Sequence, residues 1–593
     1  MTAYKAPIRD MLFALQEVGG LDRVTALPGN EEISEDLVAA ILEEAGKFAG
    51  DVLAPLNQSG DRQGCVCKDG VVTTQDGIKE AYAAFCENGW NAMPAPLDFG
   101  GQGLPALVAT PVLEMWKASN MAFSLCQMLT LGALNAINHH GSDAQKATYL
   151  PNMASGKWTG TMNLTESQAG SDLAAVRTKA IPDGDAYRIT GTKIFITWGE
   201  NDVAENIIHL VLARLPDAPP GVKGISLFIA PKFLVNSDGS LGERNDLVCA
   251  SIEHKLGIHG SPTAVMSFGE KGGAIGYLIG EANRGLEYMF TMMNHARLNV
   301  GLEGVAIAER AYQKALSYAF ERVQGKPLAA KAGDPIAYHP DVKRMLLEMK
   351  SRIEAMRALA YFTAGQMDIA HLSADADEAE KAQAVVDLLT PVVKGWCTEN
   401  AIWIASTGIQ VHGGMGFVEE TGAAQHLRDA RITTIYEGTT AIQANDLVGR
   451  KIARDGGAAA KALIVEIEAD LRAWAGSGIA SLAKPLETPL GRFASAVDWI
   501  VRTHKAAPEN TAASAVPMLH LTGITVGYWL ILRQAAAALR SRNAGEDPNF
   551  VKAKLAYAFF YAAHVLPQTE PLFASVVGGP DAITQFDPAL MIH

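Results

Sequence analysis

Hydrophobic residues recur at helical spacing along most of the chain. Between residues 34 and 57, SEDLVAAILEEAGKFAGDVLAPLN places apolar side chains at i, i+3, i+4 and i+7, which predicts an amphipathic helix. A Gly- and Pro-rich interruption at residues 97–106 precedes NMAFSLCQMLTLGALNAINHH, where helical patterning resumes. We therefore expect an N-terminal extension over residues 1–40 and an N-terminal helical domain over residues 41–159.

The spacing changes near residue 160. The segments DAYRITGTKIFITW, NIIHLVLARL and GISLFIAPKF are short, rich in β-branched residues and bounded by Gly, Asp or Pro, which is typical of strands. Helical spacing returns near residue 280 and continues into an Ala- and Leu-rich tail. The order predicts an α+β multidomain protein, with a middle β-domain over 160–280, a helical bundle over 281–450 and an additional C-terminal helical domain over 451–593.

Composition and charge narrow the class of protein. The 593 residues exceed what one core supports, and 48% hydrophobic with 19% charged residues indicates a folded chain. A net charge of −14 argues against nucleic acid as a partner. The six cysteines are scattered without a zinc-binding set, which favours reduced thiols, no metal site and a cytoplasmic location.

Neither the N-terminus nor residues 510–532 has the full pattern of a targeting or membrane sequence. The first 20 residues lack an apolar run and carry acidic side chains, which is a poor leader. Residues 510–532 have no formal charge, but Pro517 and His520 interrupt them. We expect a buried bundle helix there and no membrane interaction.

A polar loop follows a short apolar run at residues 162–180. Its sequence, MNLTESQAGSDLAAVRTKA, offers hydroxyls and backbone N–H groups to an anion or a polar ring edge. From the residues alone, a connecting loop capped by Ser and Asp is the favoured reading. Downstream, Phe195 and Thr197 fall on one face of a predicted strand, where they would suit either a flat heterocycle or ordinary packing.

Glycines mark two further places. Gly301 and Gly304 interrupt the helical pattern of residues 294–325, at a cost of about 1 kcal/mol each relative to Ala, which a close packing partner or a ligand would explain. The pair Gly413–Gly414 in IQVHGGMGF lets the backbone approach a cofactor. His412 beside it is expected to be structural rather than a ligand.

Glu437 in TTIYEGTT has two interpretations. Thr434-Ile-Tyr-Glu437 fits the capping-box template S/T-x-x-E, which makes Glu437 a structural residue at a helix start. The same glutamate, next to glycine and hydroxyl residues, suits a base for proton abstraction. The local pattern alone favours the structural interpretation.

Six segments in order carry a resemblance to a known family. LTESQAGSD, ITGTKIFIT, KLGIHGSPTAVMSF, NRGLEYMFTMMNHARL, IQVHGGMGF and LRDARITTIYEGTTAIQ resemble motifs of the acyl-CoA dehydrogenases, a family of flavoproteins, over roughly residues 40–450. The N-terminal extension, YHPDVKRMLL and the long tail resemble an extended subfamily that includes 3-methylmercaptopropionyl-CoA dehydrogenases.

The resemblance implies FAD between a helical N-terminal domain, a β-domain and a helical bundle. It assigns Met162, Leu164 and Thr165 to one side of the flavin and Phe195 and Thr197 to the other, with Ser171 near the FAD phosphates and the substrate. Thr439 is expected near the phosphate side of FAD, and a second subunit is expected to offer it Arg322, Gln410 and Gly414. Substrate contacts fall to Ser171, Arg297, Tyr436 and Gly438. Arg322-Val323-Gln324-Gly325 departs from the family's Arg-x-x-Phe-Gly, because it is one residue shorter and lacks the Phe.

The resemblance also decides the role of Glu437. It aligns with the base that removes the α-proton of an acyl-CoA thioester while the β-hydride passes to N5 of FAD. Relatives that carry the base on the long helix have it where this chain has Ala296, which cannot serve, and nitroalkane-oxidising relatives use Asp instead. We expect Ile435 and Tyr436 to flank an apolar pocket that raises the pKa of Glu437.

The implied reaction is conversion of 3-methylmercaptopropionyl-CoA to 3-methylthioacryloyl-CoA, in dimethylsulfoniopropionate catabolism. The alternatives are a short-, medium- or long-chain acyl-CoA dehydrogenase of fatty acid metabolism, an acyl-CoA oxidase, and a DNA-associated flavoprotein. The last fits poorly, because residues 451–593 hold 13 Lys and Arg against 12 Asp and Glu. The expected partners are an acyl-CoA, electron-transfer flavoprotein as electron acceptor, and a second copy of the chain in a homodimer.

Overall fold

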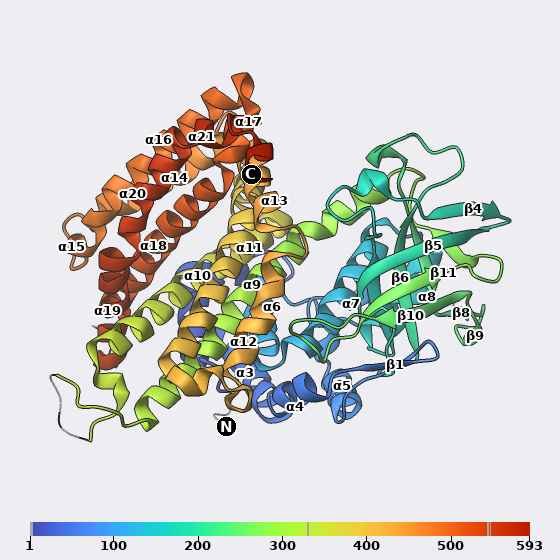
Figure 1. The fold of residues 1–593 in the computed structure, drawn as a ribbon, viewed down its shortest axis with the longest axis horizontal. Coiled ribbons are helices and arrows are strands. Elements are labelled where there is room, and N and C mark those ends of the chain that lie inside the picture. The colour runs from blue at the N-terminus through green and yellow to red at the C-terminus, as the bar shows by residue number, and fades with distance from the viewer. Residues whose placement is uncertain (1–3, 329–330, 332, 543–544, 546, 593) are drawn as a thin grey trace. The chain divides into compact units, whose positions relative to one another are not determined.

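The computed structural model describes residues 4–328, 331, 333–542, 545 and 547–592 (Figure 1). The chain divides into two units, each treated by itself. The β unit comprises residues 47–104 and 119–296, and the helical unit comprises residues 1–46, 105–118 and 297–593.

A mixed sheet forms the centre of the β unit. Its strand order is β10-β11-β5-β12-β7-β6-β3, with β4 paired to β5. Only β3 and β6 among these described pairs run parallel, and the other pairs are antiparallel. The strands are β3 (Trp158–Asn163), β4 (Lys179–Asp183), β5 (Ala186–Thr197), β6 (Asn206–Ala213), β7 (Ser226–Pro231), β10 (Leu247–Ile252), β11 (Thr263–Phe268) and β12 (Ala274–Leu278). The predicted strands are confirmed.

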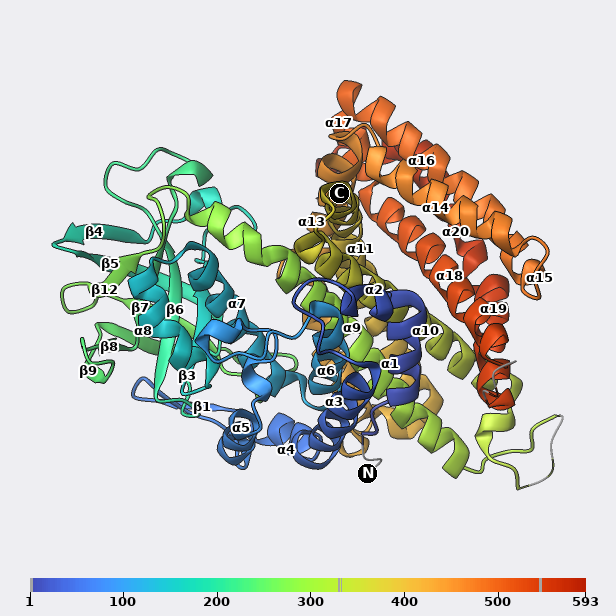
Figure 2. The ribbon, with the colours of Figure 1, turned by 180° about the vertical axis from the view of Figure 1, so that it is seen from behind.

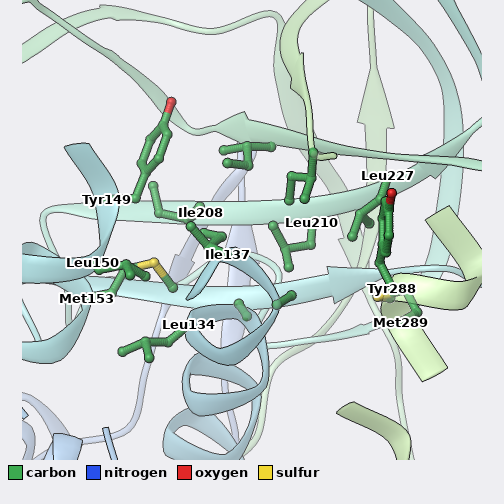
Figure 3. Packing of buried hydrophobic residues seen from close by; sticks show 14 of the residues in the cluster. Leu134, Ile137, Tyr149, Leu150, Met153, Ile208, Leu210, Leu227, Tyr288 and Met289 are labelled. Carbon is green, nitrogen blue, oxygen red and sulfur yellow. The ribbon is translucent and has the colours of Figure 1, made fainter. Parts of the chain in front are cut away.

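Helices cover one face of this sheet. Leu134 and Ile137 of α7 (Met121–His140), with Leu150 of α8 (Asp143–Ala154), pack on Ile208 and Leu210 of β6 (Figure 3). Val211 and Ala213 face a second apolar cluster on the other side. Strand β6 is thus buried on both faces, which explains its continuous apolar run. The remaining elements of this unit are α4 (Pro55–Gln63), α5 (Ile78–Glu87) and the hairpins β1–β2 (Val66–Lys68, Val71–Thr73) and β8–β9 (Phe233–Val235, Leu241–Arg244).

Strand β5 contains a bulge. Its register with β11 shifts between Ala264 and Met266, and Phe195, opposite this shift, has a positive φ of 59°. The extra residue interrupts the alternation between Lys193 and Ile196, whereas Phe195 and Thr197 are both more exposed than the buried Ile196 between them, which agrees with their expected place on one face. Phe195 remains 59% exposed.

Long helices build the helical unit. Gly301 and Gly304 lie on α9 (Gly285–Glu321), where an added Cβ would come within 2.7 Å of the backbone of Val393 and Cys397 on α11 (Ala376–His412). The glycines therefore permit close helix packing, one of the two explanations that the sequence left open. The other bundle helices are α6 (Ala106–Ser119), α10 (Pro340–Leu372), α12 (Ala423–Ala430) and α13 (Thr440–Asn445).

The tail is helical, as expected. It comprises α14 (Ala458–Trp474), α15 (Ala480–Ala483), α16 (Glu487–Ala506), α17 (Pro508–Ala513), α18 (Ala515–Arg542), α19 (Pro548–His564), α20 (Thr569–Gly578) and α21 (Pro580–Thr584). Two helices of the described chain, α7 and α18, are long and apolar enough to cross a membrane, but their apolar windows are 78% and 83% buried within the protein. Such burial is typical of core helices and confirms the expected buried helix around residue 520.

The N-terminal extension is packed rather than loose. Helices α1 (Ile8–Ala14), α2 (Leu21–Thr25) and α3 (Glu35–Phe48) occupy it, and Met11, Leu15 and Leu21 are completely buried. Figure 2 shows α1 and α2 beside α10. An added Cβ at Gly365 of α10 would lie 2.1 Å from the carbonyl oxygen of Gly19, so the two backbones are in close contact.

Buried charges join distant parts of the helical unit. Arg357 of α10 donates to Glu114 of α6 at 2.6 Å and to Glu309 of α9 at 2.9 Å, and the Tyr361 hydroxyl donates to Glu114 at 2.8 Å. All four side chains are buried. Such a cluster holds the helices in one register only while each charge keeps its partner.

A second cluster closes a ring of ion pairs. Lys350 lies 2.8 Å from Asp10 and 2.7 Å from Glu354, and Lys554 lies 2.9 Å from Asp10 and 2.5 Å from Glu354. Burial alone would raise the pKa of Asp10, but the two lysines outweigh it and hold the pKa well below its usual range. The ring joins α1, α10 and α19.

Candidate active site

Glu437 lies in a strained loop between α12 and α13. Its φ is 53° and that of Gly438 is 91°. A left-handed conformation at a residue other than Gly costs on the order of 1–3 kcal/mol and is common at functional sites. Neighbouring structure must therefore hold the loop in place.

The capping-box interpretation of Thr434 and Glu437 is wrong. Helix α13 begins at Thr440, and its N-cap is Thr439, whose side chain accepts a hydrogen bond from the Ile442 amide at 3.4 Å. The Thr434 hydroxyl instead donates to the Arg431 carbonyl oxygen. Glu437 precedes the N-cap residue, and its carboxylate does not cap helix α13.

Two buried side chains hold the backbone of the loop. The Lys394 ammonium donates to the Gly438 carbonyl oxygen at 2.6 Å. The Gln443 amide nitrogen donates to the carbonyl oxygens of Glu437 at 3.0 Å and Gly438 at 3.3 Å. Because Lys394 and Gln443 are both fully buried, water does not compete for these hydrogen bonds, which help to offset the conformational strain of the loop.

The electrostatic surroundings of Glu437 act in opposite directions. Burial raises the pKa of Glu437, whereas Lys394 and Arg297 lower it. Arg297 on α9 is itself buried and paired with Asp446 at 2.6 Å. A carboxylate in these surroundings is a stronger base than one in water, yet two cations favour its ionised form.

The pocket walls differ from the expectation for Ile435 and Tyr436. Ile435 is 46% exposed in this chain, so it does not shield Glu437. The Tyr436 hydroxyl donates to Glu303 on α9. Burial, Glu303 and Glu437 all raise the pKa of Tyr436, so the phenol stays neutral and serves as a donor.

The β unit carries the other predicted cofactor residues. Met162 lies at the end of β3, followed by Leu164 and Thr165, and all three are half-buried. The Thr165 carbonyl oxygen accepts from the Ile194 amide at 2.9 Å, and the Thr161 hydroxyl donates to the Thr197 carbonyl oxygen at 2.7 Å. Residues 162–165 thus form a ledge tied to β5. Ser171, farther along the loop, is exposed.

Glu166 stabilises this ledge through Lys193. Its carboxylate accepts from Lys193 at 2.8 Å, from the Thr178 hydroxyl at 2.6 Å and from the Arg177 amide at 2.8 Å. Lys193 also donates to the Leu164 carbonyl oxygen at 2.9 Å. Burial opposes ionisation, but Lys193 and these hydrogen bonds lower the pKa of Glu166 to about 2.

Replacing Glu166 by Gln is expected to weaken the β unit by about 2–4 kcal/mol, because the buried Lys193 loses its counter-ion. The folded pKa of Glu166 is depressed, so its contribution is complete above the ordinary carboxyl pKa of 4.5 and is lost as the pH falls toward about 2. Urea unfolding at pH 7 and pH 3 measures both effects. The gap between Glu166→Gln and wild type should be wide at pH 7 and narrower at pH 3. The exposed Glu205 provides the control Glu205→Gln, and equal losses in the two variants would contradict the assignment.

The helical unit exposes the residues expected to reach a second subunit. Arg322 follows the end of α9, and Gln410 and Gly414 lie at the end of α11; all three are exposed. His412 is buried, stacks on Tyr318 at 4.5 Å between ring centroids, and contacts the Gly408 carbonyl oxygen through Nδ1 at 2.7 Å. These contacts agree with the structural role expected for His412.

Sequence reasoning missed the buried partners of Glu437. Lys394, Glu303 and Gln443 carry no motif, and Lys394 and Gln443 contact the loop across 44 and 5–6 residues. One signal was available: Lys394 is the one charged residue in LLTPVVKGWC, and a lone lysine within a buried helical run needs a polar partner.

Comparisons with known proteins indicate the same family for nearly the whole chain. Family models match as Acyl-CoA dehydrogenase, N-terminal domain (residues 36–157), middle domain (161–270) and C-terminal domain (283–452), and as Acetyl-CoA dehydrogenase C-terminal like (463–587). The expected fold class, a helical, a β and a helical domain with an additional C-terminal helical domain, is confirmed.

Individual relatives extend this agreement. The 3-methylmercaptopropionyl-CoA dehydrogenase of Ruegeria pomeroyi is 47% identical over 98% of this chain and 99% of its own length. A butyryl-CoA dehydrogenase of Syntrophomonas wolfei is 36% identical over 95% of each chain. The structure of an acyl-CoA dehydrogenase complexed with FAD from Bacillus anthracis superposes with a TM-score of 0.74 at 20% identity, covering 93% of this chain and 90% of the other, which shows a shared fold. The chain therefore belongs to the acyl-CoA dehydrogenase family, and it is an enzyme that dehydrogenates an acyl-CoA.

Proposed function

We propose that Glu437 removes the α-proton of the acyl-CoA. The observation that carries this proposal is the strained conformation of Glu437, whose loop two buried donors hold in place. Burial raises the basicity of the carboxylate. Strain at a non-glycine residue, compensated by side chains from two helices, is expected where the geometry of one functional group matters.

The amide of Glu437 supports the same proposal. Among the described residues, none accepts a hydrogen bond from it. A free N–H beside the base is suited to bind the thioester oxygen, where negative charge develops as the proton leaves. Donors of this kind contribute about 3–4 kcal/mol each to catalysis.

The residues present fit FAD. Phe195 offers an aromatic ring that is 59% exposed on a bulged strand, and the ledge of residues 162–165 supplies half-buried side chains and backbone groups. A flat ring system stacks on such an aromatic surface. FAD, when bound, supplies the acceptor for the β-hydride. We assign Phe195, Thr197 and the ledge to holding it, with Ser171 and Thr439 as additional polar contacts.

We propose a homodimer, and the exposed face at the end of α11 supports it. Met415, Phe417 and Val418 are 49%, 88% and 40% exposed beside Gln410 and Gly414. Exposed apolar groups of this size mark interaction surfaces, and a second copy would bring Arg322, Gln410 and Gly414 to its partner's FAD. Light scattering on the holoenzyme measures the mass, and a monomer would contradict the proposal.

The substrate we propose is 3-methylmercaptopropionyl-CoA, dehydrogenated to 3-methylthioacryloyl-CoA. The support is the end-to-end similarity to the Ruegeria pomeroyi enzyme of that name. The butyryl-CoA dehydrogenase relative, at lower identity over a similar length, keeps a short linear acyl chain as the second candidate. We further propose electron-transfer flavoprotein as the electron acceptor, and rapid H₂O₂ formation in air would instead identify an oxidase.

Anaerobic bleaching of the flavin against a panel of acyl-CoAs tests this function. The panel comprises the 3-methylmercaptopropionyl, butyryl, octanoyl and palmitoyl thioesters. We expect the first to give the highest ratio of reduction rate to half-saturating concentration, because the Ruegeria pomeroyi enzyme named for this substrate is 47% identical over 98% of this chain. A higher ratio for butyryl-CoA would overturn the substrate, and no bleaching with any thioester would overturn the reaction.

A further inference from the structure

Lys394 is an unusual residue for the centre of a helix bundle. It lies on α11 between Val393 and Trp396, which are completely buried, and is itself completely buried. A charged side chain costs free energy in such a place unless it is paired and hydrogen-bonded. Burial accordingly lowers the pKa of Lys394 to about 8, although Glu303 and Glu437 favour its charged form.

The position of Lys394 relative to Glu437 gives it two physical effects. Its ammonium donates to the Gly438 carbonyl oxygen at 2.6 Å, one residue beyond the base. Its charge also acts on the Glu437 carboxylate. The first effect holds the strained loop, and the second favours the ionised carboxylate that a base requires.

Arg297 contributes to this second effect as well, but less than Lys394 does. Its guanidinium is bonded to the Asp446 carboxylate at 2.6 Å, which offsets much of its charge at a distance. Loss of a nearby cation raises the pKa of a carboxylate in such surroundings and lowers the fraction that can accept the α-proton. Lys394 is the larger of the two cationic influences on Glu437.

We propose that Lys394 is a positioning residue for the base, holding the Glu437–Gly438 loop and favouring the ionised form of the half-buried Glu437 carboxylate. The proposal rests on the proposed role of Glu437. It requires no direct contact between Lys394 and the substrate.

Other charged and titratable groups around the loop also contribute to the electrostatic surroundings of Glu437 and its neighbours. Glu303 is bonded to the Tyr436 hydroxyl, and Glu399 accepts from the Thr440 hydroxyl at 2.6 Å. The groups that act on Glu437, Lys394, Tyr436 or Glu303 from the packed elements are Arg297 and Glu303 on α9, Lys117 on α6, Lys394 and Glu399 on α11, Asp429 on α12 and Tyr436 in the loop itself, with Asp446 paired to Arg297. A variant of Lys394 leaves all the other groups unsubstituted.

Three variants separate charge from hydrogen bonding. Lys394→Gln keeps a donor for Gly438 and removes the charge, Lys394→Met removes both, and Lys394→Arg keeps the charge. Lys381→Met, at an exposed lysine on the same helix, is the matched control. Each FAD-loaded enzyme is mixed anaerobically with 3-methylmercaptopropionyl-CoA or butyryl-CoA from pH 6 to pH 9.5.

The expected result is a shift of the ascending limb of the rate–pH profile. Loss of a neighbouring opposite charge raises a carboxyl pKa by about 1–3 units, so Lys394→Gln and Lys394→Met should both move the limb upward by at least about one unit. Lys394→Met should also lose more rate than Lys394→Gln at the plateau. Lys394→Arg and Lys381→Met should keep the limb of wild type.

A second measurement is independent of hydride transfer. A 3-thia-acyl-CoA has sulfur at the β position and no β-hydride to give, and exchange of its α-protons with D₂O, followed by NMR, reports the base alone. Lys394→Gln should slow this exchange at pH 7 by about 10-fold, which is one pKa unit of lost ionisation. Circular dichroism and flavin content verify the fold of each variant.

The outcomes distinguish this inference from the proposed function. Unchanged exchange in Glu437→Gln would overturn Glu437 as the base. If Glu437→Gln abolishes exchange while Lys394→Gln keeps the rate and pH limb of wild type, the role of Lys394 is overturned. Lower stability of Lys394→Met with a wild-type limb in Lys394→Gln would also overturn it, because that result describes a purely structural lysine.

Discussion

Replacing Glu437 by Gln is expected to lower the rate of flavin reduction by roughly 10³–10⁴-fold, toward the upper end of what a general base contributes. The amide has nearly the same size as the carboxylate but cannot accept the α-proton. The clamps from Lys394 and Gln443 bind backbone oxygens, so the loop should keep its conformation. Stopped-flow absorbance of the flavin under anaerobic conditions measures the effect.

The control for this substitution is a glutamate with the same charge and no part in the site. Glu380, exposed on α11, provides Glu380→Gln, which should match wild type. Circular dichroism and FAD content of Glu437→Gln should also match wild type. A Glu437→Gln enzyme that reduces its flavin at more than a tenth of the normal rate would exclude Glu437 as the base.

The largest effect on stability is expected for Arg357→Met. The substitution leaves the carboxylates of Glu114 and Glu309 without their shared cation in the interior of the helical unit. Breaking a buried ion pair from one side costs about 3–5 kcal/mol. Urea unfolding at pH 7, followed by far-ultraviolet circular dichroism, should show a loss of this size.

Two comparisons sharpen the result. Arg344→Met removes a partly exposed arginine from the same helix. Its partners are Asp341, at the surface, and Glu348, which keeps Arg352 as a second cation, so the loss should be no more than about 1 kcal/mol. Burial would raise the pKa of Glu309, but Lys350 and Arg357 hold it below its usual range. Its contribution is thus present at pH 7 and lost as the pH falls below the ordinary carboxyl pKa, so the deficit of Arg357→Met should shrink in acid. A deficit independent of pH would indicate lost packing instead.

Periodicity was sufficient to predict the main elements. The continuous apolar run of β6 and the helical spacing around residue 520 reflect burial, which the sequence encodes directly. The bulge at Phe195 was not predictable, because residues 194–196 are all apolar and their types do not mark where one residue is inserted. The helices within residues 1–40 were not predicted. They are short and are interrupted by Gly19 and Gly20, so they contain too few apolar residues at helical spacing to form a recognisable pattern.

The candidate site was predictable only through the resemblance. Locally, Glu437 matched a helix cap, and nothing in TTIYEGTT indicates a left-handed glutamate, a conformation that sequence patterns assign to Gly or Asn. The clamps of the loop come from other helices. Pairings such as Lys394 with Gly438 depend on tertiary packing and leave no periodic trace, although an isolated lysine in an apolar run is a usable signal.

The ring formed by Asp10, Lys350, Glu354 and Lys554 has a consequence for biosynthesis. Asp10 leaves the ribosome more than 500 residues before Lys554, and translation adds about 5–20 residues per second. During that interval Asp10 lacks one of its two lysine partners. We therefore expect α1 to be held less firmly, with its apolar side more accessible to other proteins, until α19 has been made.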